Sequence, residues 1–358
     1  MALIYPSGTD CSLSSQPTAV TVELLTEIWQ SVLKRPAVRL DDDFFEIGGS
    51  PRLADLLFAQ IAQKFRRELP SATIFHAPTI AALAAVFDQA VFPRFSPFVE
   101  LKAGRQHPPI LIAPGLDGRA SFSGLAQLIR SEHPIYGMQA KGVDGLEDPL
   151  DSIEEMAEFY LGSLKDLQAE GPYILIGYSF GGLVALEMAQ RLLEQSKQIA
   201  LLVMIDAYPH PRYLSAPQRF QLGAQRTKRR ILELKRRSLH EGLSYLREGI
   251  ERRWHIVGTQ SGSQASQLSL QQTTVRVKRK AYVALGRYRP RLYSGNIKFI
   301  KSDTDTYFPG NPVPVWAHLA EAFEVETVRG SHLNMVTTHF EGLAAVLTRY
   351  VIEAAGRG

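Results

Sequence analysis

The pattern of apolar and polar residues divides the chain into two parts with different periodicities. From Thr18 to Ala90, apolar residues recur every three or four positions in the segments VELLTEIWQSVL, PRLADLLFAQIAQKFRREL and TIAALAAVFDQA, with the short segment SATIFHAP before the last. This spacing is typical of helices that bury one face. Residues 18–90 are therefore predicted to form a small four-helix bundle, preceded by a flexible N-terminus over residues 1–17.

The pattern changes after residues 91–107, which contain prolines and are predicted to be a linker that leads into an edge strand. Across residues 108–358, short apolar or alternating runs such as PILIAP, YILIGY, ALLVMID and NIKFIKSD alternate with segments of helical periodicity. Strands that alternate with helices predict a mostly parallel sheet with helices on both faces. The fold class expected for this second part is α/β.

Residues 209–291 interrupt this alternation with helical and basic sequence. The segment contains 19 Lys and Arg residues against 4 acidic ones. We interpret it as a set of lid helices whose charged side chains face solvent. A second interpretation is a docking surface for an acidic partner or a phosphate-bearing ligand, attracted over long range.

Composition and charge narrow the possible classes of protein. The net charge of +4 is small for 358 residues and does not by itself indicate a nucleic-acid binder. The single cysteine, Cys11, excludes a disulfide framework and favours a reducing compartment. There is no signal-peptide pattern and no apolar run near the roughly 20 residues that span a bilayer. We therefore expect a soluble cytoplasmic protein with no membrane or nucleic-acid partner and no metal site.

The segment YILIGYSFGGLVALEMA contains the pattern G-x-S-x-G around Ser179. On its own this pattern is common, but here an apolar strand precedes it and a helical segment follows it. That context is typical of a nucleophile elbow, a sharp turn that exposes the serine hydroxyl at the carboxyl edge of a parallel sheet. An ordinary turn with serine as a helix cap is the alternative. Ser179 is the predicted nucleophile.

A serine nucleophile needs a base and an acid that orients it, in the chain order Ser, Asp or Glu, His for this fold class. His332 follows a predicted strand near the C-terminus and is the expected base. Asp206 ends one predicted strand, whereas Asp303 and Asp305 end the next. The spacing alone leaves the choice of acid open.

An oxyanion hole needs two backbone N–H groups aimed at one point, one of them from the residue after the nucleophile. That residue is Phe180. The second donor is expected from Gly115 or Leu116 in the segment ILIAPGLDG, where Pro114 has no N–H to give.

Residues 109–355 resemble the type I thioesterase domains that end nonribosomal peptide and polyketide synthases, which are α/β-hydrolases. The segments that carry the resemblance are GPYILIGYSFGG, LLVMIDAYP, YRPRLYSGNI and GSHLNMV. The resemblance implies Asp206 as the acid, in preference to Asp303 or Asp305, and implies that residues 209–291 form a helical lid over an acyl channel. The first loop of the family usually reads His-Pro, and here it is Ala113-Pro114.

Residues 18–90 resemble the peptidyl or acyl carrier domain that precedes such thioesterases. The segment LDDDFFEIGG matches the approach to the family's serine, which holds 4′-phosphopantetheine. An ungapped alignment places Pro51 at that serine and Ser50 one residue early. Ser50 followed by Pro51 is also a good start for a helix, since serine caps the first turn and proline suits the next position. Either Ser50 carries the arm, or the domain carries none.

Together these features predict a serine thioesterase that releases an acyl, peptidyl or polyketide chain from a carrier-bound thioester, by hydrolysis or cyclisation. The 4′-phosphopantetheine would be attached to Ser50 or to a partner carrier, and an upstream synthase is a possible partner. The alternative is a carrier-independent esterase or coenzyme A thioesterase, in which residues 18–90 serve only to dock the protein onto a synthase.

Overall fold

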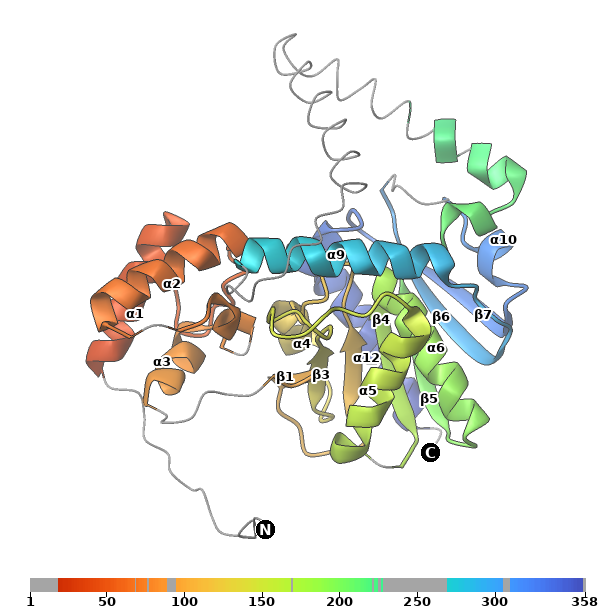
Figure 1. Cartoon of the computed structure of the whole chain (residues 1–358). Coiled ribbons are helices and arrows are strands. Elements are labelled where there is room, and N and C mark those ends of the chain that lie inside the picture. Colours follow the sequence, from red (N-terminus) through yellow and green to blue (C-terminus); the bar gives the residue numbers. More distant parts are fainter. Residues whose placement is uncertain are drawn as a thin grey trace, which may run out of the picture.

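The computed structural model describes residues 19–67, 69–75, 77–88, 95–168, 170–220, 222–224, 227, 269–304 and 310–356. Figure 1 shows helices of the N-terminal part on one side, a mixed sheet with its covering helices on the other, and one long helix that extends from the first group over the second. Within the described part of the chain, every helix is too short or too polar to cross a lipid bilayer.

The N-terminal helical region, as we call the described residues from 19 to 88, consists of α1 (Ala19–Leu33), α2 (Pro51–Phe65), the 3₁₀ helix η1 (Ser71–Phe75) and α3 (Ile80–Asp88). The predicted helical stripes bury one face: Trp29 of α1, Leu57 of α2 and Leu83 of α3 have no exposed surface. One of the four predicted helical segments is thus a short 3₁₀ turn, which lies between Pro70 and Pro78.

The sheet has seven strands in the order β1-β3-β2-β4-β5-β6-β7. The β1 strand at one edge is antiparallel to β3, and all other neighbours are parallel. The strands are β1 (Phe98–Lys102), β2 (Ile110–Ala113), β3 (Ile135–Met138), β4 (Tyr173–Tyr178), β5 (Ile199–Ile205), β6 (Tyr293–Ser302) and β7 (Ala320–Val328).

Helices cover both faces of the sheet, as the alternation of strands and helices predicts. Successive strand residues point to opposite faces, so Leu111 packs in the cluster of α5 (Ile153–Leu167) and α6 (Phe180–Glu194). Its neighbour Ile110 packs on the other side, with α4 (Ser123–Leu128) and α12 (Glu341–Ala355). The shorter helices are η2 (Pro211–Tyr213), α10 (Val313–Trp316) and α11 (Asn334–Thr337).

The predicted lid is described at its two ends only, and most of its basic helical sequence lies outside the described residues. Its C-terminal part forms α9 (Leu270–Arg287), the long helix in Figure 1. A capping box begins α9, because the Ser269 side chain accepts from the Gln272 amide while the Gln272 side chain accepts from the Ser269 amide.

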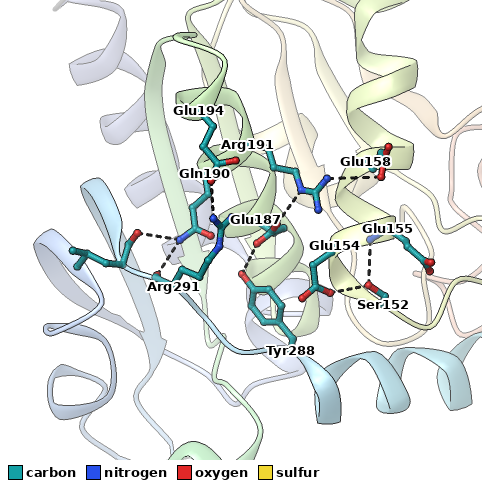
Figure 2. A network of polar contacts seen from close by, with 11 residues as sticks. Ser152, Glu154, Glu155, Glu158, Glu187, Gln190, Arg191, Glu194, Tyr288 and Arg291 are labelled. Carbon is teal, nitrogen blue, oxygen red and sulfur yellow. Dashed lines mark hydrogen bonds and ion pairs between the residues drawn. The ribbon is translucent and has the colours of Figure 1, made fainter.

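A polar network fixes the chain just after α9 (Figure 2). Its centre is Glu187 of α6, which is 2% exposed. The Glu187 carboxylate accepts from Arg191 Nε at 2.9 Å and from the Tyr288 hydroxyl at 3.1 Å, and it pairs with Arg291 at 3.4 Å. Because burial and the nearby negative charge disfavour ionised tyrosine, the pKa of Tyr288 is raised. The C-terminal end of the lid is thereby tied to α6.

Candidate active site

Ser179 occupies the sharp turn between β4 and α6. Its φ of 54° and ψ of −120° are unusual for a residue with a side chain. The flanking glycines allow the close approach: a Cβ on Gly177 would lie 2.4 Å from the Gly181 carbonyl oxygen, and one on Gly181 would lie 2.3 Å from the Pro114 carbonyl oxygen. The Ser179 side chain makes no capping hydrogen bond to α6. Its hydroxyl is therefore directed to something other than the helix.

That hydroxyl meets His332, which follows β7 on the loop toward α11. His332 Nε2 lies 3.0 Å from Ser179 Oγ, and His332 Nδ1 lies 3.2 Å from Asp206 Oδ2. The Asp206 side chain is 2% exposed and that of His332 is 24% exposed. The structure thus brings three of the predicted site residues together in one continuous chain of polar contacts, at the carboxyl edge of the sheet.

The other two candidate acids do not share this position. Asp303 follows β6, and its carboxylate accepts from the Gly330 amide at 2.9 Å, so it holds the loop that leads to His332. Asp305 lies outside the described residues. The geometry therefore favours Asp206 as the acid, in agreement with the resemblance.

Two further residues fix the arrangement, and the sequence analysis did not find them. Ser302, at the end of β6, donates its hydroxyl to Asp206 Oδ2 at 2.8 Å and its backbone N–H to Asp206 Oδ1 at 3.1 Å. Tyr178 donates its hydroxyl to the His332 carbonyl oxygen at 2.8 Å, and its ring stacks on the imidazole with centroids 4.9 Å apart. Burial, with the negative charge of Asp206, raises the pKa of Tyr178, which keeps this hydroxyl a donor.

A signal for Ser302 was present in the sequence, because it stands at the end of the strand that was predicted to follow Asp206. The parallel pairing of β5 and β6 aligns Ile205 with Ile300, so the residues just beyond both strands meet at one edge. No pattern in the sequence distinguishes Tyr178 from a tyrosine of the sheet core.

The predicted oxyanion residues line an apolar pocket beside Ser179. A Cβ on Gly115 would lie 3.9 Å from Ser179 Cβ, so the backbone of this loop passes close to the serine. Phe180 and Leu116 line the same pocket. Its other walls are apolar residues of α5, α6 and α9, namely Met156, Phe159, Tyr160, Val184, Val277 and Ala281. An apolar acyl group could lie here with its carbonyl at the serine.

Two protein-family descriptions match the chain. "Thioesterase domain" matches residues 108–350, and "Phosphopantetheine attachment site" matches residues 23–87. The chain belongs to the thioesterase family. Its fold is that of the α/β-hydrolases, as the seven-stranded, mostly parallel sheet and its two helical layers show, and a carrier-type region precedes it.

The similar curated proteins are large synthetases, of which this thioesterase spans only a small part. It is 34% identical over 196 residues to a dimodular nonribosomal peptide synthase of Bacillus subtilis (strain 168), covering 54% of this chain and 8% of the relative. Over 318 residues it is 28% identical to malpibaldin synthetase of Mortierella alpina, covering 87% of this chain and 5% of the relative.

Solved structures share the fold at lower identity. The holo form of a four-domain nonribosomal peptide synthetase, crystallised with AMP and glycine, has a TM-score of 0.55 at 20% identity, and the match covers 98% of this chain and 27% of that one. The type II thioesterase of the yersiniabactin pathway has a TM-score of 0.51 at 17% identity, covering 72% of this chain and 99% of that one. These likenesses support the fold.

The attachment-site match implies 4′-phosphopantetheine, and the surroundings of Ser50 fit that group. Ser50 Oγ accepts from the Leu53 amide at 3.3 Å, a bond that does not use the hydroxyl proton. The oxygen can therefore cap α2 and still form a phosphodiester, and the N-terminus of a 15-residue helix favours a phosphate. Pro51 is the first residue of α2 and offers no hydroxyl. Among the described residues, no group of three or more metal-ligating side chains is found.

Proposed function

We propose that this chain is a serine thioesterase that releases an acyl or peptidyl group from a carrier-bound thioester. The observation that carries the proposal is the run of contacts from Ser179 Oγ to His332 Nε2, at 3.0 Å, and from His332 Nδ1 to Asp206, at 3.2 Å. A hydroxyl within reach of an imidazole that is itself oriented by a carboxylate is the arrangement that activates serine for acyl transfer.

In the first half of the reaction, Ser179 Oγ attacks the acyl carbonyl carbon while His332 Nε2 takes the hydroxyl proton. The 4′-phosphopantetheine group supplies the thiol that presents the acyl group as a thioester. As the carbon–sulfur bond breaks, His332 gives its proton to the departing sulfur, and the acyl group stays on Ser179 as an ester. Asp206, nearly without solvent contact, stabilises the imidazolium that exists between these two proton transfers.

Negative charge develops on the carbonyl oxygen during this attack. The backbone N–H of Phe180, together with that of Gly115 or Leu116, is the proposed partner of this oxygen. Phe180 is the first residue of α6, so the positive end of the helix dipole adds to the stabilisation.

In the second half, His332 activates the group that attacks the ester. Water at this step releases a free acid, whereas a hydroxyl or amine of the acyl chain itself releases a ring. The apolar walls contributed by α5 and α9 exclude water from much of the pocket, which makes both outcomes compatible with the site.

The test compares a pantetheine thioester with an oxygen ester of the same acyl group. We expect the thioester to be the better substrate and expect Ser179→Ala to lower kcat/KM by about 10⁴-fold or more, because the nucleophile and base act as a unit. Turnover by Ser179→Ala within tenfold of the wild type would contradict the proposal.

A second candidate is a carrier-independent esterase or coenzyme A thioesterase, with the N-terminal helical region as a synthase-docking module. The observation that favours it is Pro51 at the aligned attachment position. Intact-mass measurement after incubation with coenzyme A and a phosphopantetheinyl transferase separates the candidates. A gain of one arm that is lost in Ser50→Ala supports attachment on this chain, whereas no gain supports a partner carrier or the second candidate.

A further inference from the structure

The α9 helix belongs to two hydrophobic clusters at once. Its first residue, Leu270, is 2% exposed and packs in the core of the N-terminal helical region. Two turns and more along the same helix, Val277 and Ala281 form part of the wall of the apolar pocket beside Phe180. In Figure 1, α9 accordingly begins beside α2 and runs above the sheet and its helices. A movement of its first turn would therefore be transmitted to the pocket.

A carboxylate of the helical region holds that first turn. Asp55 of α2 accepts from the Leu270 amide at 3.0 Å. The first amides of a helix have no partner within the helix, and the capping box at Ser269 satisfies that of Gln272 but not that of Leu270. Asp55 thus supplies a cap from a separate part of the chain, and its negative charge is favoured at the positive end of the α9 dipole.

Two glycine-containing loops of the thioesterase domain seat α9 tightly. A Cβ on Gly145, at φ +82°, would lie 2.9 Å from Thr273 Oγ1. A Cβ on Gly118, at φ +69°, would lie 2.9 Å from Val277 Cγ1. Gly118 ends the turn that begins at Gly115, the loop proposed to supply an oxyanion donor. Little space separates the lid helix from this loop, so the position of α9 and the shape of the site are coupled.

We propose that Asp55 is a positioning residue for acyl transfer: by holding the first turn of α9, it lets the carrier-type region set the position of the lid over the acyl pocket. The inference rests on the proposed function of Ser179 for its catalytic consequence. Asp55 itself touches neither Ser179, His332 nor the pocket lining, and acts through α9.

The first experiment measures hydrogen exchange of the α9 amides in the full chain. Asp55→Ala should speed exchange in the first turn of α9 by about fivefold, the usual effect of losing a cap. Alanine is favourable in α2 itself, so the helix that bears the substitution should persist. Asp55→Asn keeps an acceptor oxygen of a good capping residue and should restore slow exchange. Asp41→Ala is the matched control, because it removes an exposed carboxylate of the same region that pairs only locally with Arg39.

The second readout is the split between kcat and KM. Asp55→Ala should raise KM several-fold for a pantetheine thioester with a long apolar acyl group, while an acetyl thioester, too small to depend on the α9 wall, should react as in the wild type. Unchanged α9 exchange in both Asp55→Ala and Asp55→Asn, with KM unaltered, would overturn the inference. Failure of the proposed function is separate, since an active Ser179→Ala would leave the exchange result standing.

Discussion

At the scale of single residues, the site depends on two strained positions at neighbouring strand ends. Ser179 and Asp206 both have positive φ, at 54° and 44°, which costs on the order of 1–3 kcal/mol each for residues with side chains. The surroundings hold them there. Backbone bonds of 2.8 Å join the Ser179 amide to Ile205 and the Asp206 amide to Ile300. The strain aims both side chains at His332.

Ser302 offers a test of how Asp206 is oriented. Ser302→Ala removes the 2.8 Å hydroxyl bond to Asp206 Oδ2, the oxygen that also meets His332, but keeps the backbone bond to Oδ1. We expect kcat to fall about tenfold with KM unchanged, given the usual strength of a hydrogen bond to a charged group. Ser302→Thr keeps the hydroxyl and should recover most of the rate. Steady-state kinetics of both variants check this, and an alanine variant within twofold of the wild type would argue against the role.

The sequence was sufficient to indicate Ser179 and His332, because a strand, a serine turn and a helix are consecutive in the chain. It could not choose between Asp206 and Asp303, which follow adjacent parallel strands and so reach the same edge of the sheet. The choice depends on where the β7 loop carries His332. Tyr178 could not be singled out either, since its role is a contact with a residue 154 positions away.

At the scale of elements, α4 is capped by a carboxylate from the N-terminal helical region. Both oxygens of Glu46 accept from the Gly124 amide, at 2.9 and 3.0 Å. Nearby, Arg119 lies over the Phe45 ring, 4.3 Å from its centroid. Burial, together with the charges of Asp43 and Asp42, raises the pKa of Glu46 from 4.5 to about 7, although the amides of Ser123 and Gly124 act against this.

This pKa predicts that the contact between the two regions depends on pH. In the docked state Glu46 keeps its proton up to about pH 7, whereas a free glutamate loses it near 4.5. The stabilisation is therefore complete below about 4.5 and is lost as the pH rises through about 7. Asp43, which is buried beside Glu46 and faces Arg119, also has a raised pKa and adds to the trend.

Thermal unfolding of the wild type and Glu46→Gln at several pH values isolates the Glu46 part. Glutamine imitates the protonated form and leaves Asp43 in place. We expect the wild type to lose more stability than Glu46→Gln between pH 5 and pH 8, values chosen to span the shift. Parallel pH curves for the two proteins would contradict the assignment of this effect to Glu46.

At the scale of the whole molecule, three contacts join the carrier-type region to the thioesterase domain: Glu46 with Gly124, Phe45 with Arg119, and Asp55 with Leu270. The sequence predicted both parts, since each is built from local periodicity. It gave no indication of these contacts, because surface residues of two separately folded parts have no common period. The lid illustrates the same limit: its helical sequence was readable, but its attachment to α2 was not.

The central claim is that His332 activates Ser179 as the acyl-accepting nucleophile. A fluorophosphonate that reacts with activated serines tests it directly, with intact mass and peptide mapping of the wild type, Ser179→Ala and His332→Ala. The account predicts one adduct on the wild type, located on Ser179, and loss of labelling in both variants. Labelling of His332→Ala at the wild-type rate, or an adduct on another residue that persists in Ser179→Ala, would contradict it.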